Sequence, residues 1–600
     1  MSEVKPIRTE AAYEAALAEI GRLWGAKLGT PRGDRLDVLA TLVDAYESEH
    51  HPIDPPDPIE AIKFRMEQQG LTRKDLEGIL GTRTRIADVL QTGRLSSGIM
   101  RGRDWNAVNF GWPLKTAASG STLSTNQRFP PERSAMSAPV LRNEATDPAI
   151  IAALRARFGD RLSTAPAVRT QHGKDESYHA AHAPDAVVFA RSTEEVAETV
   201  KLCAAHKVPV IAYGTGTSLE GQVAALKGGI CIDLMQMNKV LRVSVEDLDV
   251  TVEPGVTRKQ LNEHLRDTGL FFPIDPGADA SIGGMTATRA SGTNAVRYGT
   301  MRENVLTLTV VLADGRVIKT GRRARKSAAG YDLTRLFVGS EGTLGIITEI
   351  TLRLYGIPQA ISSAMCSFEN IEDAVNTVIL TIQSGIPVAR IELADDVQMK
   401  AITLHSKLDL PIANTLWLEF HGTEASVAEQ AEMVQAIAKD FGGNDFSWTT
   451  LPEDRKRLWQ ARHDAAYANK ILAPGKQLWA TDVCVPISRL AECISETKKD
   501  IAGSFMLAPL VGHVGDGNFH LTLMLDPGDP RDIAEAERLN TRLVARALAM
   551  EGTCTGEHGV GYGKIDFLQA EHGEALSVMR LVKKALDPDN IMNPGKIVRM

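Results

Sequence analysis

The feature that most constrains this chain is a set of three loops rich in glycine, serine and threonine. They cover residues 214–221, 276–299 and 339–347, and each lies beside a segment that reads as a buried strand. Glycine lets backbone N–H groups approach an anion closely, and serine and threonine hydroxyls add further donors. One such loop is an ordinary turn, but three in one chain predict a site that wraps an extended dinucleotide.

The first of these loops follows a predicted strand–helix–strand unit. AVVFA (186–190) and VPVIAY (208–213) predict strands, and the segment between them predicts a helix capped by Ser192. The loop itself reads GTGTSLEG, with GxGxxxxG spacing, whereas a nicotinamide-type fingerprint needs GxGxxG before a helix. The pattern therefore indicates a diphosphate-binding loop of a different kind.

Taken in order, the three loops resemble the FAD-binding domain of the vanillyl-alcohol oxidase / p-cresol methylhydroxylase superfamily. The resemblance implies that FAD is bound by Gly214, Thr215, Gly216, Thr217 and Ser218 at the pyrophosphate, by Asp279, Ser281, Gly284, Ser291, Gly292 and Asn294 along the ribityl chain, pyrophosphate and flavin, and by Ile347 near the adenine. Some members hold the flavin covalently through a His or Cys in the first loop. This loop has neither, so we expect non-covalent FAD.

A second group of polar residues lies in PLVGHVGDGNFHLTLML (509–525), where Asp516-Gly517 separates two apolar runs. An Asp-Gly pair in this setting is a strong hairpin signal. A two-residue turn would place His513 opposite His520, with Cβ atoms about 5 Å apart. Two such imidazoles form either a plain cross-strand pair or part of a divalent-metal site.

The segment GEHGVG (556–561) supplies a third donor. Glu557 adds a hard oxygen, and the set His513, His520 and Glu557 predicts a site for Zn, Mn or Fe with positions open for substrate. The adjacent His558 would point elsewhere and stay free as a base, since the pKa of imidazole is about 6.5.

The second half of the chain resembles the FAD-linked oxidase C-terminal domain of D-2-hydroxy acid dehydrogenases, and most closely the flavin-dependent D-lactate dehydrogenases. The matching motifs are WQARH (459–463), TDVCVP (481–486), the two-histidine hairpin, GEHGVG and DPDNIMNPGK (587–596). The resemblance implies metal binding by His513, His520 and Glu557, with His558 as base, Arg462 on the substrate carboxylate, Asn518 near the substrate and Asn593 near the flavin.

These implied roles predict oxidation of D-lactate to pyruvate by hydride transfer to flavin N5. The metal and Arg462 would hold the substrate while His558 takes the hydroxyl proton, and electrons would pass to a quinone, a cytochrome or an electron-transfer flavoprotein. D-2-Hydroxyglutarate and glycolate are the alternative substrates. In the resembling family, members that act on D-2-hydroxyglutarate carry a lysine just before the strand where this chain has Ala480-Thr481-Asp482, and the loss of that cation disfavours a dicarboxylate.

The N-terminal residues 1–102 have a different texture. TRKDLEGIL (72–80) and TRTRIADVLQTG (82–93) predict a helix-turn-helix, and residues 10–95 are similar to bacterial antitoxins of the HigA type, which implies operator DNA and a toxin as partners. The chain then runs into 103–140 without an apolar period, so we expect an incomplete remnant, with Met136 as an internal start for the enzyme. A flavin-linked DNA-binding regulator is the alternative from another class.

Composition narrows the remaining choices. Six scattered cysteines without a CxxC pair argue against disulfides or Cys-ligated metal, and the net charge of -8 argues against a general nucleic-acid binder. No apolar run is long enough for a membrane-spanning helix, and the N-terminus lacks a signal core. We expect a cytoplasmic protein, or one peripheral at the inner membrane.

The expected fold class is α+β. A two-subdomain FAD-binding domain of the vanillyl-alcohol oxidase type would cover 141–360, an α+β cap 361–555, and a segment returning to the flavin 556–600. A small all-α extension (1–102) and a linker (103–140) would precede them.

Overall fold

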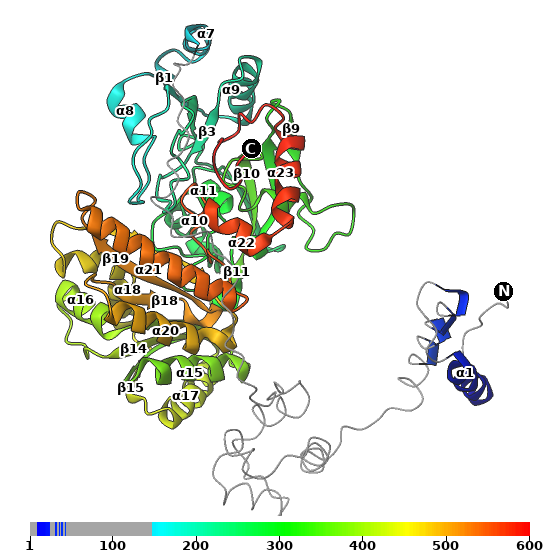
Figure 1. Cartoon of the computed structure of the whole chain (residues 1–600), viewed down its shortest axis with the longest axis vertical. Coiled ribbons are helices and arrows are strands. Elements are labelled where there is room, and N and C mark those ends of the chain that lie inside the picture. The colour runs from blue at the N-terminus through cyan, green and yellow to red at the C-terminus, as the bar shows by residue number, and fades with distance from the viewer. Residues whose placement is uncertain (1–8, 24–29, 33–34, 37, 40–41, 44–146) are drawn as a thin grey trace, which may run out of the picture. The chain divides into compact units, whose positions relative to one another are not determined.

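The computed structural model describes residues 9–23, 30–32, 35–36, 38–39, 42–43 and 147–600 (Figure 1). Contacts divide the chain into two units, Met1–Gln127 and Arg128–Met600. In the first unit, α1 (Glu10–Leu23) buries Ala16 in a small cluster with Leu39 and Val43. The predicted helix-turn-helix and linker lie outside the described residues.

The second unit begins with a four-stranded sheet in the order β1-β2-β4-β3. It contains β1 (Leu162–Ser163), β2 (Ala186–Phe189), β3 (Val210–Tyr213) and β4 (Ile230–Asp233), and the last three run parallel. The helix α9 (Thr193–Ala205) joins β2 to β3 and is capped by Ser192, whose side chain accepts a hydrogen bond from the Glu195 N–H. The predicted strand–helix–strand unit is therefore confirmed, and the first glycine loop leaves from the carboxyl end of β3, where parallel sheets bind ligands.

A five-stranded antiparallel sheet carries the other two loops. Its order is β5-β6-β10-β8-β9, with bounds Val240–Ser244, Asp249–Val252, Ile346–Arg353, Val305–Val311 and Val317–Lys319. The second loop lies between β7 (Leu270–Phe271) and β8 and contains α11 (Ile282–Thr288), which Ser281 caps by accepting from the Gly284 N–H. The third loop leads directly into β10.

The third sheet forms the other half of the unit (Figure 1). Its order is β15-β12-β14-β13-β18-β19-β16, with β17 (Val483–Cys484) paired to β19, and the bounds are Asn444–Thr449, Ala360–Phe368, Asn414–Gly422, Val388–Ala394, Leu510–Gly512, Asn518–Leu525 and Gln477–Ala480. Helices α15 (Ile371–Gln383), α17 (Glu424–Asp440), α20 (Leu490–Ala502) and α21 (Pro530–Ala549) share one core with it. The predicted α+β cap is present, and the change of sheet falls between β11 (Tyr355–Gly356) and β12.

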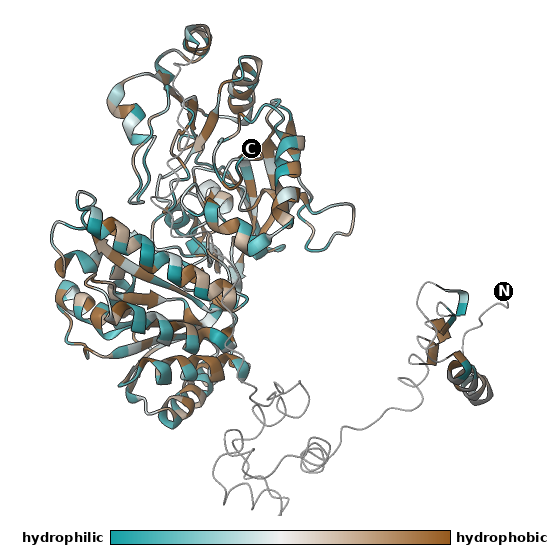
Figure 2. Cartoon of the chain, viewed as in Figure 1, coloured by the Kyte–Doolittle hydropathy of each residue, from teal (hydrophilic) through white to brown (hydrophobic). Residues whose placement is uncertain are grey.

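The inner strands of this sheet are buried on both faces, because helices also cover the second face. Along β14, Leu416 and Leu418 belong to the core with α15 and α17, whereas Trp417 packs with Trp459 of α18 (Pro452–His463) in another cluster. Figure 2 shows hydrophobic residues, in brown, along strands in this half of the unit. Alternate residues of a strand face opposite sides, so the second face carries the side chains that reach the site.

The C-terminal residues return to the first half. After α22 (Leu568–His572) and α23 (Ala575–Leu586), Met592 forms a parallel bridge with Val210 of β3 and is buried in the core of the four-stranded sheet. Among the described residues, no helix combines the length and the apolar content needed to cross a bilayer.

Candidate active site

A cavity lies between the glycine loops and the second face of the cap sheet. The residues on its wall that the sequence singled out are Gly214, Thr215, Gly216, Thr217, Ser218, Ser281, Gly284, Ser291, Ile347 and Asn593 from the expected flavin site, and Arg462, His513, His520, Glu557 and His558 from the expected substrate site. One cavity therefore contacts both sets, although they come from separate sheets.

Four other predicted site residues do not line this cavity: Asp279, Gly292, Asn294 and Asn518. The Asp279 carboxylate accepts hydrogen bonds from the Lys259 N–H and the Thr257 hydroxyl at the start of α10 (Arg258–Leu265). Asn294 is buried and donates to the Pro273 carbonyl, and a Cβ on Gly292 would lie 2.5 Å from the Asp275 backbone. Asp279, Gly292 and Asn294 therefore support the second loop without lining the cavity, whereas Asn518 lies on β19 and donates to Asp482 Oδ1.

The predicted register of the two-histidine hairpin is wrong. His520 pairs with Val511 rather than with His513, because Val514–Asp516 forms a 3-10 turn and Gly517 takes a left-handed conformation with φ 79°. The register is shifted by two residues, and a shift of two leaves side chains on the same face. The two imidazoles consequently still meet, with ring centroids 5.5 Å apart.

Glu557 lies between these two histidines. Its Oε1 is 3.1 Å from His513 Nε2 and 3.4 Å from His520 Nε2, and the three donor atoms lie within 4.8 Å of one another. All three side chains are largely buried. Two imidazole nitrogens and a carboxylate oxygen converging in this way are a donor set suited to a divalent cation.

His558 lies directly beside this cluster. Its ring stacks on that of His520 with centroids 4.8 Å apart and planes 6° apart, and burial lowers the pKa of His558 to about 4. The Nδ1 atom of His558 is buried and has no hydrogen-bond partner among the described residues. The imidazole is therefore neutral near pH 7, with an unused nitrogen.

Arg462 reaches the cavity from the end of α18. Its Nη2 is bonded to Glu392, a buried residue of β13, and Glu392 also shares a 2.8 Å hydrogen bond with His513 Nδ1. Arg462 Nε is buried without a hydrogen-bond partner among the described residues. Glu392 thus orients both the arginine and the histidine, a role that its place in an ordinary apolar strand did not signal.

Two further carboxylates that the sequence analysis did not assign hold the GEHGVG loop. Asp482 Oδ2 accepts from the N–H groups of Glu557 and His558, both at 3.0 Å. Glu341 of the third glycine loop accepts from the Val560 N–H at 2.7 Å and the Gly561 N–H at 2.8 Å. Burial raises the pKa of Glu341 to about 7.

The residues present fit both a dinucleotide and a cation. A Cβ on Gly214 would lie 2.3 Å from Ser281 Oγ, so glycine is what lets the first and second loops form a close cradle. Around the histidines, contacts join four buried carboxylates to two permanently cationic side chains and to His513, whose pKa the carboxylates of Glu392 and Glu557 raise well above its usual value against the effect of burial: Glu220, Glu392, Asp482, Glu557, Arg462 and Lys564. A bound divalent cation would be paired with these carboxylates.

Two family models match the chain. The model described as "FAD binding domain" matches residues 184–321, and the model described as "FAD linked oxidases, C-terminal domain" matches 357–597. Solved structures share the fold: 4-ethylphenol oxidase from Gulosibacter chungangensis (TM-score 0.65, 20% identity, 76% of this chain and 98% of that chain) and p-cresol methylhydroxylase (TM-score 0.64, 20% identity, 77% and 99%). These matches define a FAD-linked oxidase with a vanillyl-alcohol oxidase-type fold.

Closer relatives narrow the class. A Danio rerio protein named "Probable D-lactate dehydrogenase, mitochondrial" is 54% identical over 75% of this chain and 92% of its own length, and an Arabidopsis thaliana protein named "D-lactate dehydrogenase [cytochrome], mitochondrial" is 53% identical over 75% and 80%. The Bacillus subtilis "Glycolate oxidase subunit GlcD" is 35% identical over 69% and 89%. The chain belongs to the family of FAD-linked D-lactate dehydrogenases.

Proposed function

We propose that this chain oxidises D-lactate to pyruvate, with FAD in the glycine-loop cradle and a divalent cation on His513, His520 and Glu557. The observation that carries the proposal is the single cavity that contacts the glycine loops, these three donors, Arg462 and His558. When bound, FAD accepts the hydride at N5 and the cation lowers the pKa of the substrate hydroxyl.

Arg462 is the group that binds the substrate carboxylate. Glu392 fixes one end of its guanidinium, and Nε remains without a hydrogen-bond partner among the described residues. A guanidinium held in this way presents further N–H donors in a fixed plane, and a carboxylate accepts two of them in parallel. That bond sets which face of the substrate is turned toward the glycine loops.

His558 removes the hydroxyl proton. It is neutral because burial lowers its pKa to about 4, and its ring lines the cavity, where a neutral imidazole can accept a proton. The stacked His520 ring and the backbone bonds to Asp482 limit its movement. A base that is held in place beside the substrate hydroxyl accelerates proton removal, because the side chain does not have to move before the reaction.

The cavity favours a small monocarboxylate. Arg462 is the one Lys or Arg on the wall that the described part of the chain provides, so a second carboxylate would lack a countercharge. Ala480, Trp479 and Val511 contribute apolar surface that suits a methyl group. Glycolate is the second candidate, since the relative from Bacillus subtilis is named for it.

The test uses purified protein with bound FAD and one cation added. Under anaerobic conditions we expect D-lactate to bleach the flavin rapidly, glycolate more slowly, and L-lactate and D-2-hydroxyglutarate little. Adding an oxidised cytochrome should then restore the flavin colour, which would identify a cytochrome as one acceptor. A loaded protein whose flavin no 2-hydroxy acid bleaches would contradict the proposal.

Two earlier expectations remain predictions. The predicted DNA or toxin contact falls within residues 1–102, where most positions lie outside the described residues, and the matched family models begin at residue 184. A cytoplasmic or peripheral inner-membrane location is likewise a prediction, to be checked by fractionating cells.

A further inference from the structure

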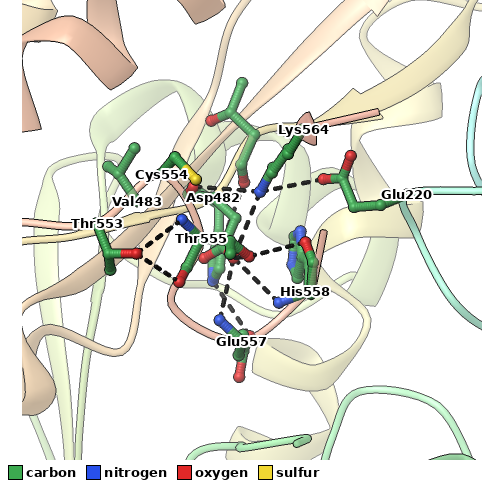
Figure 3. Close-up of polar contacts among 12 residues, drawn as sticks. Glu220, Asp482, Val483, Thr553, Cys554, Thr555, Glu557, His558 and Lys564 are labelled. Carbon is green, nitrogen blue, oxygen red and sulfur yellow. Dashed lines mark hydrogen bonds and ion pairs between the residues drawn. The ribbon is translucent and has the colours of Figure 1, made fainter. Parts of the chain in front are cut away.

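Asp482 occupies an unusual place in the network around the site (Figure 3). It is fully buried, and its Oδ2 accepts the Thr555 hydroxyl at 2.7 Å in addition to the N–H groups of Glu557 and His558. Its Oδ1 accepts from Asn518 Nδ2, also at 2.7 Å. The Asp482 carboxylate therefore binds the backbone of two consecutive residues, Glu557, the proposed cation ligand, and His558, the proposed base.

These two hydrogen bonds to the backbone fix the direction of the Glu557 and His558 side chains. Successive N–H groups aimed at one anion define the loop conformation at those residues. From that loop Glu557 reaches His513 and His520, whereas the His558 ring lies parallel to His520. The loop also approaches closely, since a Cβ on Gly556 would lie 2.3 Å from Asn518 Nδ2.

Lys564 provides the charge that a buried carboxylate needs. Its ammonium is 3.5 Å from Asp482 Oδ2, 3.3 Å from the Asp482 carbonyl oxygen and 3.1 Å from Glu220 Oε1 (Figure 3). Glu220 belongs to the first glycine loop, and both Lys564 and Glu220 are almost fully buried. A buried ion is tolerated when it is paired and hydrogen-bonded, as here.

We propose that Asp482 is a positioning residue that orients Glu557 and His558. Lys564 neutralises the Asp482 carboxylate and links it to Glu220 of the flavin half. The inference rests on the proposed function for the tasks of Glu557 and His558. It adds a residue that does not line the cavity, yet sets where the cation donor and the base point.

The chain offers a matched control. Asp395 is also fully buried, accepts a backbone N–H (Gln398, 2.8 Å) and pairs with a lysine (Lys498, 2.6 Å), but it caps α16 (Asp396–Ser406) and does not line the cavity. Asp395→Asn should therefore lower stability, as Asp482→Asn does, without touching the GEHGVG loop.

The experiment compares flavin-loaded wild type, Asp482→Asn, Lys564→Met and Asp395→Asn. We expect hydrogen–deuterium exchange of peptides covering 554–561 to accelerate in the first two variants only. Mn²⁺ affinity, measured by electron paramagnetic resonance, should fall about 10- to 100-fold in the same two. For Asp482→Asn, kcat with D-lactate should fall more than KM rises.

The exchange readout decides the inference independently of cation and activity. Wild-type exchange at 554–561 in a folded Asp482→Asn protein overturns it, and wild-type exchange in Lys564→Met overturns the role of Lys564. If Asp482→Asn does not fold, Thr555→Val removes one bond to the same oxygen and must give a smaller acceleration. A wild type that binds no Mn²⁺ would instead refute the proposed cation site.

Discussion

The side chain of His558 shows how one residue acquires a function from its surroundings. A free imidazole is half-protonated near neutral pH, but burial against His520 lowers the pKa of His558 to about 4 and leaves it neutral. Its neighbour Glu557 places a carboxylate oxygen between His513 and His520. Adjacent residues can thus divide cation binding and proton transfer between them.

Replacement of His558 tests the assigned base. We expect His558→Ala to slow anaerobic flavin reduction by D-lactate about 10²- to 10⁴-fold, because proton removal no longer accompanies hydride transfer. FAD and cation content should stay near wild type, since Glu557 and the glycine loops are unchanged. Stopped-flow absorbance measures the rate, and His572→Ala, on α22 away from the cavity wall, is the control. Near-normal reduction in His558→Ala would reject this role.

Removal of the cation tests the donor cluster of His513, His520 and Glu557. We expect a chelator to abolish D-lactate turnover while the FAD absorbance persists, because in the proposed site the flavin is held by the glycine loops and not by these donors. Adding back Zn²⁺, Mn²⁺ or Fe²⁺ separately should restore activity to different extents and identify the preferred ion. Turnover that survives complete removal of metal, shown by elemental analysis, would contradict cation dependence.

At the scale of elements, the sequence predicted more of the fold than of the contacts across it. Strand β3, helix α9 and the glycine loops follow from local patterns, and so does the hairpin between Leu510 and Leu525. Its register did not follow, because Asp516-Gly517 fits a two-residue turn and equally a 3-10 turn ending in a left-handed glycine. The prediction that His513 and His520 lie on the same face of the sheet was nevertheless correct, because a two-residue shift of register leaves each side chain on its face.

Local sequence patterns did not predict the carboxylates that hold the site residues in place. Glu392, Asp482 and Glu341 lie 121, 75 and 219 residues from the groups they bond, His513, Glu557 and Val560. In the sequence, Glu392 is one polar residue in a strand, and Glu341 is part of a glycine loop. Only the pairing of sheets and the return of the C-terminal segment show what each of them holds.

The hairpin turn makes a prediction at this scale. A Cβ on Gly517 (φ 79°) would lie 2.1 Å from the Val485 carbonyl oxygen, whereas a Cβ on Gly385 (φ 69°) would meet nothing within 4 Å. We expect Gly385→Ala to cost about 1 kcal/mol of unfolding free energy and Gly517→Ala roughly 3 kcal/mol, since strain and a clash add. Denaturant unfolding measures both. Mn²⁺ affinity should fall in Gly517→Ala alone, and equal effects of the two variants would contradict a tightly fitted turn.

At the scale of the whole molecule, the active site is assembled from three parts of the chain that meet only in the folded state. The glycine loops come from two sheets, Arg462 and the histidines from the cap, and Asn593 from the returning segment, where its Nδ2 donates to the carbonyls of Gln222 and Glu341. A cofactor bound across such loops stabilises the entire unit by mass action, by about 2.7 kcal/mol at a hundredfold excess over Kd.

The described residues that build these parts all lie after residue 147, which leads to a prediction for a chain that begins at Met136. Among the described residues, the cores around the site form from residues after 147, and the contacts divide the chain at residue 127. We expect it to match the full chain in FAD content, melting temperature and kcat with D-lactate, measured side by side. A shorter chain that is insoluble or free of FAD would show instead that residues 1–135 contribute to folding of the enzyme, and would make a purely accessory N-terminal segment untenable.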